Sequence, residues 1–150
     1  MTKHILVPTD GSKLSLKAAK AAATLARALK ARITAVYVIE PYMPPMLMEG
    51  DRFRGNLDDD RAAFEAATQK AAQAALKKVQ MAAAAGRVQC DSVSIIASRP
   101  WEGILQAVKR KKCDMIVMAS HGRGVIAGAL LGSVTAKVLS GSKTPVLVCR

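Results

Sequence analysis

Residues 115–138 read MIVMASHGRGVIAGALLGSVTAKV, a short apolar run followed at once by a stretch that holds four glycines, a histidine and an arginine. The run at 115–118 is continuous and apolar and follows the polar Asp114, which is typical of a buried β-strand. Glycines after it would let the backbone approach a ligand, and Gly132-Ser133 starts or joins a helix whose free amides favour an anion. The stretch therefore predicts a strand, a connection suited to ligand binding, and a helix.

The same order of strand and helix recurs along the chain. Apolar runs predict strands at 3–7, 33–39, 88–97, 113–118 and 145–149, and polar residues interleaved in 88–97 place that strand near a sheet edge. Helices are predicted from the Asp10-Gly11-Ser12 turn to about residue 30, from Asp58 to Gly86 with Lys77 and Lys78 near its end, from Pro100 to 112, and from about Ala129 to Leu139. Residues 41–55 read as a long surface loop. Strict alternation of this kind predicts one doubly wound α/β domain over residues 1–150, with a parallel sheet and helices on both faces.

The chain is strongly basic, with a net charge of +12 and a pI near 10.1. On the first predicted helix the cations Lys13, Lys17, Lys20 and Arg27 share one face, opposite an apolar face, which is typical of a solvated helix. Nucleic-acid modules usually add aromatic side chains for stacking, but only 3% of these residues are aromatic. We therefore do not expect a nucleic acid as partner.

The number of cysteines and the length of the apolar runs indicate the cellular compartment of the protein. Cys90, Cys113 and Cys149 are odd in number, widely spaced and beside strand-like runs, so they read as small core residues in a reducing environment rather than as metal ligands. No apolar run approaches the roughly 20 residues of a membrane span. We expect a soluble, cytoplasmic protein that does not enter a membrane.

Two familiar glycine motifs do not fit. A P-loop requires Gly-Lys-Ser or Gly-Lys-Thr, whereas Gly132 is followed directly by Ser133. Residues 122–127 match a relaxed dinucleotide fingerprint, but that motif belongs to a first strand and needs an acidic residue about 20 positions later. No Asp or Glu follows Asp114. From the residues alone, a phosphate cradle and a simple strand-to-helix connection remain equal alternatives.

Four segments together resemble the universal stress protein family, over essentially the whole chain. They are ILVPTDGS at 5–12, the predicted strands at 114–118 and 144–148, and the glycine-rich stretch between these strands. The ATP-binding branch of that family carries G-x2-G-x9-G-[S/T] after its fourth strand. Gly122, nine residues and Gly132-Ser133 match the second half of this motif, and the first glycine falls on Ala119. The resemblance implies a five-stranded parallel sheet of order 3-2-1-4-5.

The resemblance also implies a site for ATP or AMP, with Mg²⁺ as part of the nucleotide complex. It implies that Asp10 contacts the ribose, as an alternative to capping the first helix, and that Val38 faces adenine. Backbone amides and two hydroxyls from the glycine-rich stretch would surround the phosphates. The expected nucleotide-binding residues are Pro8, Thr9, Asp10, Val38, Met118, Ala119, Gly122, Arg123, Gly132, Ser133, Val134 and Thr135. No catalytic residue is predicted: His121 lies in the loop without a paired carboxylate in its segment.

Ala119 is the departure from the family pattern. If the first glycine lets a nucleotide lie against its Cα, one methyl would weaken binding by about 1 to 3 kcal/mol. If a positive φ is needed there, the effect would be larger.

The resemblance implies a homodimer as well. The apolar segment Val146, Leu147 and Val148 would form an edge strand that pairs with its twin. The function expected is therefore a dimeric, nucleotide-binding regulatory module in the stress response, with an unidentified protein partner. Two alternatives stay open: a stress protein dimer that binds no nucleotide and acts through protein contacts, and a slow ATPase.

Overall fold

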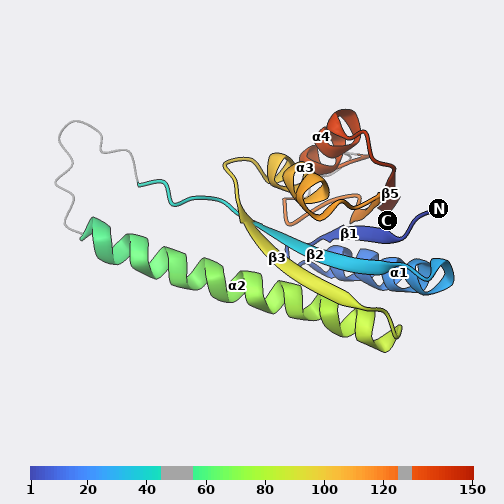
Figure 1. The fold of residues 1–150 in the computed structure, drawn as a ribbon. Coiled ribbons are helices and arrows are strands. Elements are labelled where there is room, and N and C mark those ends of the chain that lie inside the picture. Colours follow the sequence, from blue (N-terminus) through green and yellow to red (C-terminus); the bar gives the residue numbers. More distant parts are fainter. Residues whose placement is uncertain (45–55, 125–129) are drawn as a thin grey trace.

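A computed structural model of the chain describes residues 1–44, 56–124 and 130–150. Strands and helices alternate throughout (Figure 1), in the order β1 (His4–Pro8), α1 (Lys13–Leu29), β2 (Arg32–Ile39), α2 (Leu57–Ala85), β3 (Cys90–Ile96), α3 (Pro100–Lys111), β4 (Met115–Ala119), α4 (Ser133–Gly141) and β5 (Val146–Cys149). The predicted α/β class is confirmed.

The sheet is parallel and five-stranded, in the order β3-β2-β1-β4-β5, as expected. The chain first winds outward from β1 through β2 to β3, then crosses to β4 on the other side of β1. The strand order thus reverses between β1 and β4, where loops leaving the carboxyl ends of the strands diverge and leave a crevice. Both β3 and β5 are edge strands.

Two apolar layers, one on each face of the sheet, hold the helices. Ile5 and Val7 of β1 face the layer that contains the alanines of α1 and α2. Leu6, between them, faces the opposite layer, which contains Ile104 of α3 and Val138 of α4. Because neighbouring side chains of a strand point to opposite faces, an uninterrupted apolar run can serve both layers at once.

Local sequence signals account for most of the helix boundaries. Ser12 is the N-cap of α1, and its hydroxyl accepts a hydrogen bond from the Ser15 amide over 3.1 Å. Asp10 therefore does not cap this helix. Pro100 stands in the first turn of α3, where its missing amide hydrogen costs nothing. Helix α2 continues past Lys77 and Lys78 to Ala85, and Gly86 ends it as predicted.

The start of α4 differs from the prediction of about Ala129, which itself lies outside the described residues. The helix begins at Ser133. Gly132 has extended backbone angles, and its amide donates to the Ser120 carbonyl over 2.7 Å, so it cannot lie inside a helical turn. The hydrogen bond between Gly132 and Ser120, which are twelve residues apart, therefore sets the start of α4. Most of the predicted 41–55 loop also lies outside the described residues, and 41–44 are neither helix nor strand.

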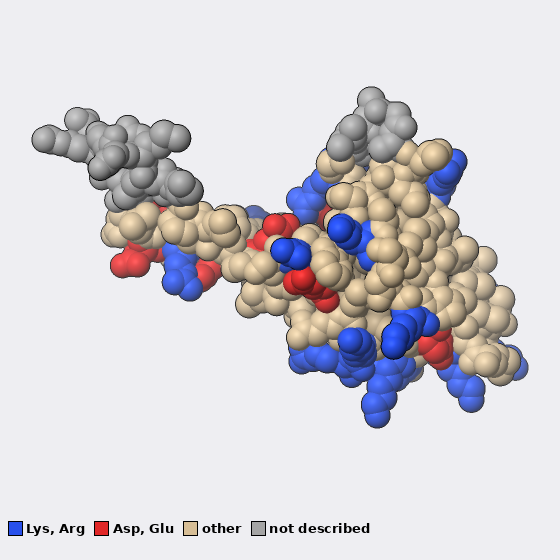
Figure 2. Space-filling model, turned by 90° about the horizontal axis from the view of Figure 1, so that it is seen from above, with Lys and Arg blue, Asp and Glu red and all other residues tan. Residues whose placement is uncertain are grey.

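The N-terminal part of α2 projects beyond the sheet (Figure 1), and the buried residues of this helix begin only at Ala72. Its first turn carries Asp58, Asp59 and Asp60. In Figure 2 acidic side chains lie along this projection, whereas most Lys and Arg side chains of that face lie on the body. No helix within the described ranges combines the length and apolar character needed to cross a membrane.

Candidate functional site

A cavity of about 540 Å³ opens at the carboxyl ends of β1 and β4, where the strand order reverses. Its walls come from the ends of three strands, the loop after β4, the start of α4, and residues of α2 and α3. All twelve residues singled out from the sequence line it: Pro8, Thr9, Asp10, Val38, Met118, Ala119, Gly122, Arg123, Gly132, Ser133, Val134 and Thr135. The structure therefore brings the whole predicted set into one space.

Asp10 joins two walls of the cavity. One carboxylate oxygen accepts the amide of Ser12 over 2.9 Å, and the other accepts the amide of Arg123 over 2.8 Å. Burial by itself would raise the pKa of the Asp10 carboxyl, but the hydrogen bonds from Ser12 and Arg123 outweigh burial and hold the pKa below its usual value. At neutral pH the cavity thus contains a fixed carboxylate, which can accept hydrogen bonds from the hydroxyls of a ligand.

Gly122 permits this contact between the two loops. A Cβ atom on Gly122 would lie 2.7 Å from Oδ2 of Asp10, closer than atoms of real side chains approach. A Cβ on Gly124, two residues later, would meet no described atom within 4 Å. Among the described residues, packing therefore requires the absence of a side chain at Gly122 and not at Gly124.

Arg123 adds a cation to the cavity wall and is held there from a distant strand. Its Nη2 donates to the phenolic oxygen of Tyr37 over 2.7 Å, and Tyr37 is only 6% exposed. The Arg123 guanidinium is thereby oriented by β2 while its backbone amide is held by Asp10. A guanidinium fixed in this way suits a phosphate or carboxylate group.

The N-terminus of α4 faces the same cavity. Ser133, Val134 and Thr135 occupy its first turn, where backbone amides have no partner within the helix. Gly132 supplies no side-chain cap, and no acidic residue lies in the turn. These amides and the helix dipole make the turn favourable for an anion. The Thr135 hydroxyl is buried and donates to the Ala119 carbonyl over 2.9 Å, so its role is largely to hold α4 against β4.

Ala119 is the last residue of β4 and is 7% exposed. Among the described residues, the non-glycine positions with positive φ are Lys30, Arg87 and Lys112. Ala119 is therefore unstrained in this chain, and the requirement for a positive φ does not apply. Its methyl still lines the cavity.

Several lining residues could not be found from sequence. Tyr37 belongs to an apolar run that reads as core, and Phe64 and Thr68 come from α2, far along the chain. Val38 lines the cavity but also packs against α3: a Cβ on Gly103 would lie 2.7 Å from both of its methyl groups. No local pattern distinguishes Tyr37, Phe64 and Thr68 from ordinary core or surface residues.

Outside the cavity, His4 is buried, its Nε2 lies 2.8 Å from the Thr34 hydroxyl, and burial lowers the pKa of its ring. Nδ1 of His121 lies 3.1 Å from the Ser120 hydroxyl at the cavity margin. Burial raises the pKa of the Cys90 and Cys113 thiols to about 11, which keeps both protonated at neutral pH. Cys113 is buried, whereas Cys90 and Cys149 are half-buried rather than fully in the core. Within the described ranges, no three His, Cys, Asp or Glu side chains gather closely enough to hold a metal ion.

Comparison with known proteins gives a consistent result. The model of the universal stress protein family matches residues 1–150. Universal stress protein MJ0531 of Methanocaldococcus jannaschii is 32% identical over 148 residues, covering 99% of this chain and 82% of that protein. The universal stress protein in QAH/OAS sulfhydrylase 3'region of Thermus aquaticus is 35% identical over 150 residues, covering both chains completely.

Solved structures share the fold. The structure of hypothetical protein MJ0577 superposes with a TM-score of 0.76 at 24% identity, covering 99% of this chain and 95% of that one. A universal stress protein in complex with cAMP gives a TM-score of 0.67 at 25% identity, with 99% and 97% coverage. One from Archaeoglobus fulgidus in complex with dAMP gives 0.64 at 15% identity, with 100% and 98% coverage.

Proposed function

The chain belongs to the universal stress protein family, and from that premise we propose that it binds an adenine nucleotide, ATP or AMP, in the cavity at the carboxyl ends of β1 and β4. The observation that carries the proposal is the meeting of an ionised Asp10, the Arg123 guanidinium and the uncapped first turn of α4 around one space. Relatives solved with cAMP and with dAMP support it.

The cavity fits such a ligand in size and chemistry. Its volume of about 540 Å³ falls within the usual range for small-molecule sites. In our proposal the Asp10 carboxylate accepts hydrogen bonds from the ribose hydroxyls, and the adenine lies near Val38. The phosphates lie against the amides of Ser133, Val134 and Thr135, close to Arg123. Mg²⁺ enters with the phosphates of ATP and neutralises part of their charge.

We propose a regulatory role rather than a catalytic one, in the cytoplasm. Binding would connect the loops after β1 and β4 with α4, and so stabilise one arrangement of these segments. The protein would act as a homodimer through the β5 edge at Val146, Leu147 and Val148, and pass the nucleotide signal to a protein partner. The alternative is a dimer that works through protein contacts without a nucleotide, and the Ala119 methyl in the cavity wall favours it.

Two glycines of one loop provide the test. Titration calorimetry with Mg-ATP, and separately with AMP, is performed on the wild type, Gly122→Ala and Gly124→Ala. We expect Gly122→Ala to weaken binding by about tenfold, because the new methyl overlaps Asp10 and separates the two loops. Gly124→Ala, at a second glycine that lines the cavity, is the matched control and should weaken binding less than Gly122→Ala because its methyl meets no described protein atom within 4 Å.

A wild type that takes up neither nucleotide at millimolar concentration would refute nucleotide binding and leave the protein-contact dimer. Equal effects of the two substitutions would show that Asp10 and its contact with the loop do not organise the site.

A further inference from the structure

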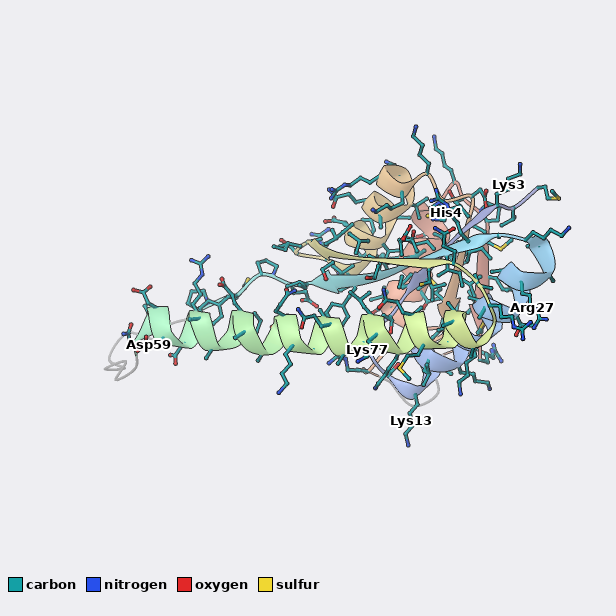
Figure 3. All side chains as sticks on the ribbon, turned by 60° about the horizontal axis from the view of Figure 1, so that its bottom comes forward. Lys3, His4, Lys13, Arg27, Asp59 and Lys77 are labelled. Carbon is teal, nitrogen blue, oxygen red and sulfur yellow. The ribbon has the colours of Figure 1, made fainter. Side chains whose placement is uncertain are left out.

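A second hollow lies at the other end of the sheet and shares no residue with the proposed nucleotide cavity. It has a volume of about 330 Å³ and is formed where α1 and α2 end and where β2 and the segment before β3 begin. Four of its lining side chains are cationic: Arg27, Lys30, Arg32 and Arg87. In Figure 3 Arg27 marks this end of the molecule, while Asp59 marks the far end of α2.

We call this cavity the basic hollow and define it by those four residues. No acidic residue lines it. The ion pairs found among the described residues are Arg61–Glu65 and Arg99–Glu102, so none of the four cations belongs to one. The ends of α1 and α2 contribute a partial negative charge of about 0.5 each, which the four side chains exceed roughly fourfold. Neutralising two helix dipoles therefore does not account for all four cations.

Two of these cations occupy a backbone conformation that favours glycine. Lys30 has φ 55° and Arg87 has φ 57°, in the left-handed region where glycine is the unstrained choice after a helix. Both positions instead carry exposed cationic residues that line the hollow. A third left-handed cation, Lys112 with φ 53°, ends α3 but does not line the hollow.

Four backbone amides that line this hollow already have partners, which leaves its cationic side chains as the main groups for recognition. The amide of Lys30 donates to the Arg27 carbonyl, and that of Arg87 donates to the Ala84 carbonyl. The amides of Ala31 and Val88 are also bonded to carbonyls of the preceding helices. Three guanidinium groups and one ammonium group remain, and guanidinium groups bind phosphate oxygens in pairs.

We propose that the basic hollow binds a small anion that carries two or more phosphate groups. Its volume, at the lower end of small-molecule sites, suits a short phosphate chain rather than a whole nucleotide. Four positive charges exceed the negative charge of a single phosphate and match that of a chain of two or three phosphates. This site acts independently of the nucleotide cavity, and either proposal can fail while the other holds.

The probe is inorganic tripolyphosphate, titrated into the protein at constant ionic strength with calorimetric detection. The decisive pair of variants is Lys30→Gly and Lys112→Gly, which remove the same side chain from the same backbone conformation after two different helices. Glycine relieves the left-handed strain at both, so both variants should fold and retain thermal stability without anion. We expect Lys30→Gly to weaken tripolyphosphate binding by about tenfold, and Lys112→Gly to change it by about twofold or less.

A double variant, Lys30→Gly with Arg87→Gly, should reduce the affinity by about a hundredfold if the two contacts are independent. The proposal is overturned if Lys30→Gly and Lys112→Gly lose affinity equally, since the effect would then be one of net charge. It is also overturned if Gly122→Ala abolishes tripolyphosphate binding while Lys30→Gly leaves it intact, which would place the anion in the nucleotide cavity.

ATP is titrated into Gly122→Ala with and without Lys30→Gly. Since Gly122→Ala only weakens the nucleotide cavity, the binding that Lys30→Gly removes is what identifies the form of the phosphate chain. Affinity equal to that of tripolyphosphate, and lost in the added Lys30→Gly, would support recognition of the phosphates alone. A higher affinity with the same loss would support a chain carried on a nucleoside.

Discussion

Asp10 shows how a single side chain can organise a cavity. It accepts one amide from its own loop and another from a residue 113 positions away, so its carboxylate joins the ends of β1 and β4. Loss of the oxygen that accepts the Arg123 amide would release one loop from the other, and loss of the other oxygen would free the Asp10 side chain from its own loop.

We expect Asp10→Asn to lower the free energy of unfolding at pH 7 by about 1 kcal/mol, because asparagine has one acceptor oxygen and can accept only one of the Ser12 and Arg123 amides. The native pKa of Asp10 lies below its value in the unfolded chain, so its stabilising contribution is present above pH of about 4 and is lost as pH falls through the native pKa. Urea unfolding from pH 7 to pH 3 should show wild type and variant converging at the acid end.

Glu65→Gln is the control: its ion pair with Arg61 lies on the exposed surface of α2, so this variant should stay within about 0.5 kcal/mol of the wild type at every pH. A difference in unfolding free energy between wild type and Asp10→Asn that is as large at pH 3 as at pH 7 would contradict a stabilising role for the ionised Asp10 carboxylate.

Ala119 provides a second prediction at this scale. Because its backbone is not left-handed, Ala119→Gly gains no conformational relief and should cost about 0.5 to 1 kcal/mol of stability in a buried strand. Removing the methyl from the wall gives a nucleotide more space in the cavity, so Mg-ATP should bind severalfold more tightly. Thermal melts and calorimetry on the same sample test both effects, and an unchanged affinity would mean that this methyl does not face the ligand.

At the scale of elements, the packing of α3 on β2 depends on the absence of a side chain. Gly103 lies in the first half of α3, directly over the methyl groups of Val38. This close approach brings α3 onto the sheet near the cavity, where Pro100 and Ile104 join its wall.

Gly103→Ala should therefore destabilise the protein by about 1 to 2 kcal/mol, even though alanine is the better helix former, because its Cβ would overlap both Val38 methyls. Val38→Ala in the same chain should restore much of the loss by vacating that volume. Chemical unfolding of the two single variants and the double variant measures the coupling. Additive effects would indicate that the two residues do not meet.

At the scale of the whole molecule, β5 leaves one long side of the sheet open. It is an edge strand, and Leu147 is 44% exposed on it. An apolar unpaired edge of this kind favours association with a second copy. The net charge of +12 on each chain opposes this association, so added salt should favour it.

We predict that Leu147→Lys converts the proposed dimer to a monomer, because it places two cations beside each other at the β5 edge. Met81→Lys is the matched control, since Met81 is 63% exposed on α2, away from that edge. Sedimentation at equal ionic strength should show monomer for the first variant and dimer for the second. A wild type that is already monomeric would refute the dimer.

Local signals in the sequence determined the class of fold and the order of its elements. Continuous apolar runs such as Ile5-Leu6-Val7 indicated strands buried on both faces, and Ser12, Gly86 and Pro100 marked helix ends because capping and proline geometry act within a few residues. The strand order and the twelve cavity positions came from the family resemblance, carried by residue type and spacing.

Only the tertiary structure decided which distant residues meet. Three features depend on contacts between segments far apart in the chain. Arg123 bonds to Asp10 and Tyr37, Phe64 of α2 lines the cavity, and α4 starts at Ser133. The gathering of Arg27, Lys30, Arg32 and Arg87 into one hollow has the same origin. Such contacts follow from how the sheet and helices pack, and short-range propensities carry no information about that packing.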